Sequence, residues 1–206
     1  MAIDLEVLTI GHSTLSYQDF VQQLRDAKVT AIADVRSTPF SQYTPHFNRD
    51  TLPAELRQDK IAYVFLGEEL GGRPNATQFF RDGIADYEKM SRADSFAVGL
   101  ERVVEGAKKY RIALMCSEQD PLECHRCLLV GRALNQMGVK VRHILGDGKA
   151  LDHAAIEQQL LELTGRAAED LFAPYAERLA FAYRERAVKV AYSEPKERPS
   201  DHVPAE

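Results

Sequence analysis

All three cysteines of the chain lie in one short segment, at positions 116, 124 and 127. Thiol groups act as nucleophiles, as redox partners or as metal ligands, and the thiolate is the reactive form. Glu118, His125 and Arg126 lie in the same segment. These residue types can hold an anion and move protons, so the segment is the first candidate for a functional site.

We predict that Cys124, His125 and Arg126 form the first turn of a helix. Backbone N–H groups at a helix N-terminus favour anions and lower the pKa of a thiol. In this hypothesis Cys124 or Cys116 is the nucleophile or a ligand, and Arg126 holds an anion with its forked guanidinium. His125 then carries protons, and Glu118 orients a histidine.

Two other interpretations of the cysteines stay open. Cys124 and Cys127 form a CxxC pair at a helix start, which is typical of thiol oxidoreductases, although Cys127 is more simply a core residue. Cys116, Cys124 and a histidine, either His12 or His125, have the chemistry of zinc or iron ligands. Their spacing matches no standard zinc signature, so no metal ligand set is assigned.

Polar residues and glycines also follow the other predicted strands. His12 has the residue type for an acid, a base or an anion donor near neutral pH. Carboxyl ends of parallel strands meet at one edge of a sheet, where open α/β folds bind their ligands. The ligand-binding candidates at this edge are Ser13, Asp34, Arg36, Gly71, Gly72, Arg73 and Arg126.

The elements that must position these residues alternate along the chain. Short apolar segments at 5–10, 30–35, 61–66, 111–116 and 141–145 predict strands. Amphipathic segments between them predict helices, including 77–90, 96–110, 123–137 and 152–163. The pattern predicts a doubly wound, Rossmann-like α/β fold: a five-stranded, mainly parallel sheet with helices on both faces. We expect the strand order 3-2-1-4-5.

The last part of the chain has a different pattern. Residues 167–190 predict a C-terminal helix with apolar contacts through Leu171, Phe172, Leu179, Phe181 and Tyr183, and 192–206 predict a disordered tail. We therefore divide the chain into an α/β domain at 1–165, a helical extension at 166–191 and the tail.

The 206-residue composition is that of a globular protein with a net charge of −5. No segment has the length of apolar sequence that a membrane span needs, and no basic region precedes the first apolar run, so we expect a cytoplasmic protein. The acidic balance does not favour a nucleic-acid partner. There is no G-x-G-x-x-G or Walker A motif, so the cofactor stays unknown, as does the oligomeric state.

Several segments together resemble the family called domain of unknown function 488. They are TIGHS at 9–13, DVRSTPFS at 34–41, PHFN at 45–48, LGEELGG at 66–72 and CSEQDPLECHR at 116–126. The resemblance implies an α/β domain with a polar pocket formed by these segments, and implies no activity. Cys127 lies outside the pattern, which weakens the CxxC interpretation.

Three functional hypotheses follow. The first is an enzyme or binder for a small anionic ligand, phosphate- or carboxylate-bearing and nucleotide-like, in a Cys/His/Arg pocket. The second is a zinc or iron centre of cysteine and histidine. The third is a non-catalytic module that binds a nucleotide, a nucleic acid or a protein.

Overall fold

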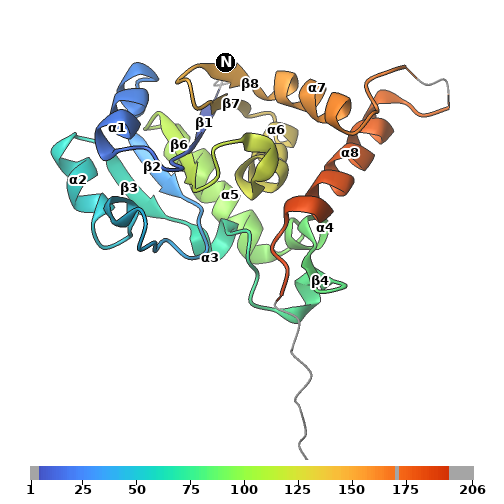
Figure 1. The fold of residues 1–206 in the computed structure, drawn as a ribbon, viewed down its shortest axis with the longest axis horizontal. Coiled ribbons are helices and arrows are strands. Elements are labelled where there is room, and N and C mark those ends of the chain that lie inside the picture. The colour runs from blue at the N-terminus through green and yellow to red at the C-terminus, as the bar shows by residue number, and fades with distance from the viewer. Residues whose placement is uncertain (1–4, 170–171, 195–206) are drawn as a thin grey trace, which may run out of the picture.

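A computed structural model describes residues 5–169 and 172–194 and contains a six-stranded sheet in that part of the chain (Figure 1). The strands are β1 (Glu6–Gly11), β2 (Ala31–Asp34), β3 (Ala62–Phe65), β6 (Ile112–Cys116), β7 (Lys140–Ile144) and β8 (Ala150–Asp152), in the order β3-β2-β6-β1-β7-β8. All neighbours pair in parallel except β8, which runs antiparallel to β7. The predicted α/β class and all five predicted strands are confirmed, and β8 is an additional edge strand.

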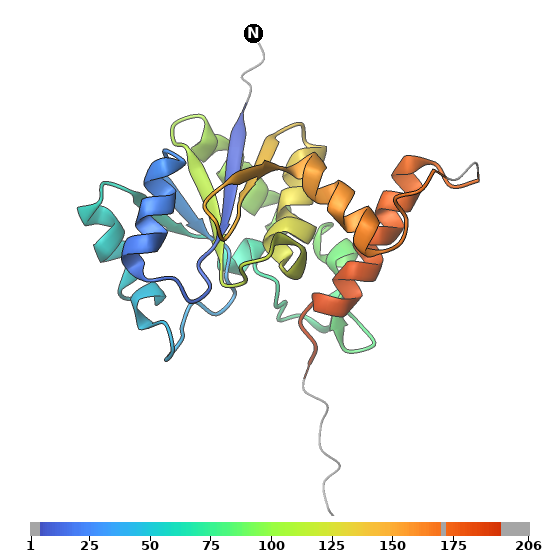
Figure 2. The ribbon, with the colours of Figure 1, turned by 45° about the horizontal axis from the view of Figure 1, so that its top comes forward.

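Helices cover both faces of this sheet, because alternate residues of its central strands are apolar on both sides (Figures 1 and 2). Leu8 and Ile10 pack on the first face with α1 (Tyr17–Asp26) and α2 (Leu52–Gln58). Val7 and Leu114 pack on the second face, in one core with α5 (Asp94–Ala107), α7 (His153–Leu163) and Tyr183 of α8 (Tyr175–Val190).

The predicted strand order is wrong in one respect that matters for the site. The segment at 111–116, the fourth predicted strand, lies between the first and the second instead of outside the first. All five residues of β6 are buried, which suits a central place with a strand on each side. The carboxyl end of β6 therefore lies next to the ends of both β1 and β2.

Three predicted helices have different bounds. Residues 77–90 contain a 3-10 turn (Thr77–Phe79), the hairpin strands β4 (Phe80–Arg81) and β5 (Ile84–Ala85), and the short α4 (Tyr87–Met90). Asp82 and Gly83 take φ of 52° and 75°, the left-handed turn that an Asp-Gly pair favours in a hairpin. This turn, which the helical pattern concealed, explains the error.

The segment predicted as one helix over 123–137 is divided. It contains a 3-10 turn (Pro121–Glu123), a π-helix (Arg126–Gly131) and α6 (Arg132–Gln136), and α3 (Gly67–Leu70) is a further short helix after β3. The expected helix over 167–190 begins only at Tyr175, because Pro174 disfavours helical backbone before it.

The C-terminal contacts agree only in part with the prediction. Tyr183 is buried, whereas Phe172 is 93% exposed. Leu171 and most of the predicted disordered tail lie outside the described residues. No helix in the described part of the chain combines the length and hydrophobicity that a bilayer crossing requires.

Candidate functional site

The candidate site lies at the carboxyl edge of the sheet, where the segments after β1, β2 and β6 meet. The segments after β1 and β6 stay paired beyond the strands: His12 N–H donates to Cys116 O at 2.9 Å, and Ser13 N–H to Ser117 O at 2.8 Å. Gly11 permits this close approach, since a Cβ there would lie 1.8 Å from the Glu118 carbonyl oxygen.

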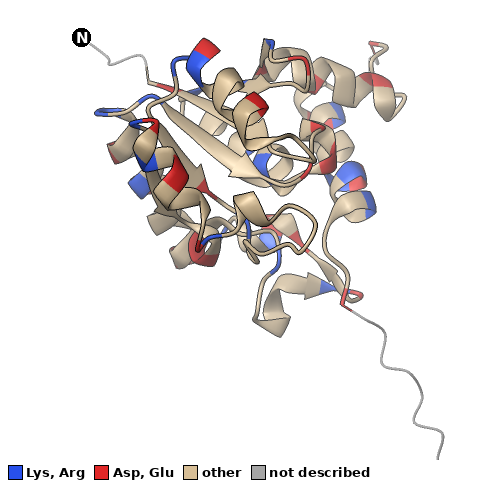
Figure 3. Cartoon of the chain, turned by 60° about the vertical axis from the view of Figure 1, so that its left-hand side comes forward, with Lys and Arg blue, Asp and Glu red and all other residues tan. Residues whose placement is uncertain are grey.

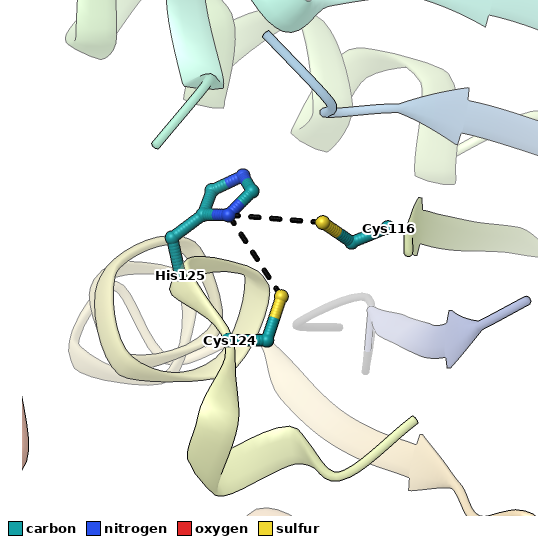
Figure 4. Close-up of side chains that lie close together, drawn as sticks. All are labelled: Cys116, Cys124 and His125. Carbon is teal, nitrogen blue, oxygen red and sulfur yellow. Dashed lines mark hydrogen bonds between the residues drawn. The ribbon is translucent and has the colours of Figure 1, made fainter. Parts of the chain in front are cut away.

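Cys116, Cys124 and His125 form the centre of the site (Figure 4). His125 Nδ1 lies 3.7 Å from Cys116 Sγ and 3.8 Å from Cys124 Sγ. All three residues are at most 9% exposed, and both cysteines are free thiols. The sequence placed Cys116 at a strand end and Cys124 at a helix start, and the fold brings their sulfur atoms together.

The orientation of the His125 ring is fixed by its backbone contact. His125 Nε2 donates to the Val35 carbonyl oxygen at 2.8 Å, because a carbonyl can only accept. In the neutral ring Nδ1 then carries a lone pair directed at the two sulfur atoms. Gly72 packs against the other side of the ring, where a Cβ would lie 2.7 Å from His125 Cγ.

Glu118 adds a carboxylate to the same cluster. Its Oε2 lies 2.9 Å from Cys116 Sγ and 3.1 Å from Cys124 Sγ. Burial and the nearby Cys124 raise the pKa of the Glu118 carboxyl. Burial, together with the hydrogen bond to Cys124, also raises the pKa of Cys116 well above its usual value. These crowded acids therefore share protons rather than ionising together.

Cys124 has the opposite behaviour, although it is also buried. Its carbonyl accepts from Cys127 N–H and Leu128 N–H, both at 3.1 Å, and its Sγ accepts from Arg126 N–H at 3.4 Å. Burial alone would raise the pKa of the Cys124 thiol. The Cys116 hydrogen bond and the positive charges of Arg126 and His125 outweigh burial and hold that pKa well below its usual value.

The charge of Cys124 also acts on its histidine neighbour. Burial lowers the pKa of His125, but the Cys124 thiolate and the Val35 contact together raise it above its usual value. Without a metal, both shifts favour a negative charge on Cys124 beside a positive charge on His125.

Arg126, which was expected to hold an anion, does not line the pocket. Its side chain is fully buried and donates to two backbone carbonyls, Glu118 O and Gln119 O. The helix start turns this guanidinium inward, beneath the loop after β6. There it fixes the loop that carries Glu118.

Asp34 and Arg36 form a buried ion pair after β2. Asp34 accepts from Arg36 Nε at 2.9 Å and Nη2 at 2.6 Å, and from Tyr63 Oη at 2.8 Å. Arg36 Nη1 donates to His12 Nε2 at 3.1 Å, so His12 carries its proton on Nδ1, which donates to Ser13 O at 2.9 Å. Burial and the Arg36 charge lower the pKa of His12 to about 4. His12 is therefore neutral at pH 7 and lies behind Arg36.

A cavity of about 140 Å³ opens onto the cysteine cluster. It is lined by Arg36, Ser37, Thr38, Gly72, Arg73, Tyr87, Cys116, Ser117, Glu118, Glu123, Cys124, His125, Val190 and Tyr192. A second cavity of about 480 Å³ shares Ser37, Thr38, Arg73 and Tyr192 with it and is also lined by Gly71. The site is thus a small inner pocket beside a larger outer one.

The structure adds wall residues that the sequence did not single out. Tyr87 precedes the cysteine segment by a long stretch of chain, and Val190 and Tyr192 follow it at the end of α8. The Arg73 guanidinium lies 5.2 Å from the centre of the Tyr192 ring. Ser13, by contrast, joins the site through its backbone only. No sequence spacing signals such walls, which depend on the docking of α8.

The fold and the site together define an α/β protein with a buried cysteine–histidine cluster at the carboxyl edge of a parallel sheet. Residues 16–133, more than half of the chain, match the family described as Domain of unknown function DUF488. The chain belongs to this family. No curated protein and no solved structure matches the chain.

Proposed function

We propose that Cys116, Cys124 and His125 hold a zinc ion and that the protein is a metal-dependent enzyme acting on a small anionic ligand. The observation that carries the proposal is the pair of distances, 3.7 and 3.8 Å, from one imidazole nitrogen to two thiol sulfurs. Ligands bound to zinc at ordinary lengths in a tetrahedron have sulfur–nitrogen separations of about 3.6 Å. The three donors are therefore close to their metal-bound arrangement.

The surroundings of these donors support the same interpretation. A metal-binding histidine almost always donates its other ring nitrogen to an acceptor, as His125 donates to Val35 O. Binding requires deprotonated sulfurs, and a zinc ion would replace the protons that the two thiols and Glu118 share. Two thiolates would neutralise the ion in this buried place.

Three protein ligands leave the fourth position of a tetrahedral zinc ion open, and this open position accounts for the pocket. Glu118 Oε2 is 2.9 and 3.1 Å from the sulfurs, nearer than the roughly 3.5 Å of a bound carboxylate in a tetrahedron. Glu118 therefore fits the role of a base beside an open coordination position better than the role of a fourth ligand. A zinc ion held by Cys116, Cys124 and His125 would supply Lewis-acid chemistry at that position.

The position of Arg73 supports the proposal that the ligand is anionic. It is exposed and lines both cavities, whereas the donors of Arg36 are engaged by Asp34, His12 and the Phe47 carbonyl. In the face drawn in Figure 3, positive and negative residues alternate over the helices and loops. A local arginine at a small pocket fits a small ligand better than a nucleic acid, which needs a basic stripe.

Elemental analysis of reduced full-length protein, purified without a metal-affinity tag, tests the metal. We expect zinc in the native protein, with loss of one equivalent in Cys116→Ser and Cys124→Ser. Ser117→Ala is the matched control, since Ser117 lines the same pocket without contacting the cluster. Folded cysteine variants with unchanged metal content would refute the site.

A metabolite screen tests the ligand. We expect turnover of a phosphate- or carboxylate-bearing compound, weaker binding in Arg73→Ala and slower turnover in Glu118→Gln. Saturable binding without conversion would instead make the protein a binding module and would end the enzyme proposal.

A metal-free cysteine enzyme is the second candidate, favoured by the N–H bond from Arg126 to Cys124 Sγ at 3.4 Å. In that case Cys124 attacks the substrate and His125 protonates the leaving group. Chelation distinguishes the two candidates. Activity that survives complete metal removal but is lost in Cys124→Ser would select the cysteine enzyme.

A further inference from the structure

A second buried cluster lies outside the pocket. Cys127 of the π-helix, His143 of β7 and His153 at the start of α7 bring three donor atoms within 4.8 Å of one another. The side chains of Cys127 and His143 have no exposed surface, and His153 is 2% exposed. Three separate elements thus direct their ligand-type residues to one point in the interior.

A chain of hydrogen bonds fixes the orientation of both imidazoles. Tyr183 Oη donates to Glu157 Oε1 at 2.9 Å, so it accepts from His153 Nε2, also at 2.9 Å. His153 Nδ1 is then unprotonated and accepts from His143 Nε2 at 2.9 Å. His143 Nδ1 in turn accepts from Thr9 Oγ1 at 2.9 Å. His143 Nε2 and His153 Nδ1 therefore face each other.

The Cys127 sulfur completes this group. It lies 3.9 Å from His143 Nε2, too far for a strong hydrogen bond. A buried thiol beside two inward-facing imidazole nitrogens is a cysteine–histidine ligand set of the kind that zinc uses. Each imidazole already has an outer partner, Thr9 or Tyr183, as metal-bound histidines do.

We propose that Cys127, His143 and His153 form a second site, which binds a zinc ion in the interior. On binding, the His143 proton moves from Nε2 to Nδ1, where it donates to Thr9 Oγ1. His153 keeps its proton on Nε2, which still donates to Tyr183 Oη. The Cys127 thiol loses its proton to solvent, so one metal ion enters and one proton leaves.

The required movements are small. In a tetrahedral zinc site, nitrogen–nitrogen separations are about 3.3 Å and sulfur–nitrogen separations about 3.6 Å. The observed 2.9 Å between the two histidine nitrogens and 3.9 Å between His143 Nε2 and the sulfur must therefore change by roughly 0.3–0.4 Å.

Charge compensation supports a divalent ion. A zinc ion with one thiolate and two neutral imidazoles carries a single positive charge, which would be costly to bury alone. Glu157 lies next to this position, hydrogen-bonded to Tyr183 and 3.6 Å from His153 Nε2. Its carboxylate would offset positive charge at this position, where the buried Arg126 guanidinium also acts on Cys127 and His143.

Cobalt(II) titration tests this site in full-length protein that has been reduced and stripped of metal. The Cys116→Ser/Cys124→Ser double variant removes the pocket donors and isolates the second site. We expect this variant to bind one cobalt ion, with tetrahedral cobalt absorption bands and a thiolate-to-cobalt band. Calorimetry in buffers of different ionisation enthalpy should report about one proton released.

Two variants remove the second site without touching the pocket cysteines. Cys127→Ala and His153→Gln should each bind one cobalt ion fewer than the unaltered protein and keep the two-thiolate spectrum of the pocket. Circular dichroism tests whether each variant is folded. If Cys127→Ala does not fold, His153→Gln provides the test. Unchanged binding in a folded variant overturns this proposal alone, whereas unchanged binding in Cys116→Ser/Cys124→Ser overturns the pocket site alone.

Discussion

Neutralising Asp34 should destabilise the protein far more than neutralising an exposed carboxylate. Asp34 has no exposed surface and accepts four hydrogen bonds, from Arg36 N–H, Nε and Nη2 and from Tyr63 Oη. Asp34→Asn removes the negative charge and places an amide NH₂ among these donors. Arg36, only 5% exposed, would then hold an uncompensated charge.

The expected cost follows from this burial. Removing one partner of a buried ion pair typically costs about 3–5 kcal/mol. In a domain of this size each kcal/mol lowers the midpoint of thermal unfolding by roughly 2–4 °C, so a fall of roughly 10 °C is expected. Urea unfolding of metal-free protein gives the free energy, and an unchanged slope shows that the denatured state is not the cause.

Two variants make the measurement specific. Glu105→Gln breaks the exposed pair with Lys108 and should change stability by less than about 0.5 kcal/mol. Asp34→Asn combined with Arg36→Met leaves no unpaired charge and should recover part of the loss. A cost below about 1 kcal/mol for Asp34→Asn, or a double variant as unstable as the sum of its parts, would show that the ion pair does not hold this wall of the pocket.

Three further outcomes are expected. Because the pKa of His12 is lowered to about 4, the unfolded chain binds a proton there below pH 6.5 that the folded protein does not, so the contribution of His12 to stability should fall between pH 6.5 and 4 by up to about 1.4 kcal/mol per pH unit. Urea titrations should show a shallower fall in His12→Gln, and an identical fall would contradict the assignment. Gly72→Ala places a methyl group against the His125 ring and should weaken pocket metal binding about 10–100-fold in a cobalt titration. Gly106→Ala, which meets only the end of Ile112, is its control, and equal affinities would refute the role of Gly72. Arg126→Lys loses the fork that holds two carbonyls and should cost about 2 kcal/mol in urea unfolding, whereas a neutral result would show that the loop after β6 needs no such support.

The sheet could be predicted from sequence because its strands carry their own signal. The segment ending at Cys116 is short and apolar, and the fold class follows from the alternation of such segments with helices. The order of the strands could not be predicted in the same way. Both orders bury the same residues and use allowed crossovers, and the choice depends on packing between segments far apart in sequence.

The corrected order strengthens the site. With β6 between β2 and β1, the segment after β2 carries Arg36 and the Val35 carbonyl to the cysteine cluster. In the expected order, β1 would have separated them. The sequence could indicate which residues share the edge, but the neighbour that orients His125 depends on strand order.

The second cluster has a weaker signal in the sequence. His143 is buried in β7 near Val141 and Ile144, and His153 begins a helix after it. A histidine in a buried strand needs a polar partner, which the sequence could have flagged. The identity of that partner depends on where α7 packs, and no local pattern contains this information.

The wall of the pocket extends beyond the part of the chain that matches the family. The match ends at residue 133, whereas Val190 and Tyr192 line the cavity. This segment is held by Tyr192 O, which accepts from Ala85 N–H at 2.9 Å, and by Arg186, which donates to Leu122 O at 2.9 Å. The donors of the cluster thus come from the family domain, while one wall comes from the end of α8. The ligand that this chain accepts should therefore depend on residues which the shared family sequence does not determine.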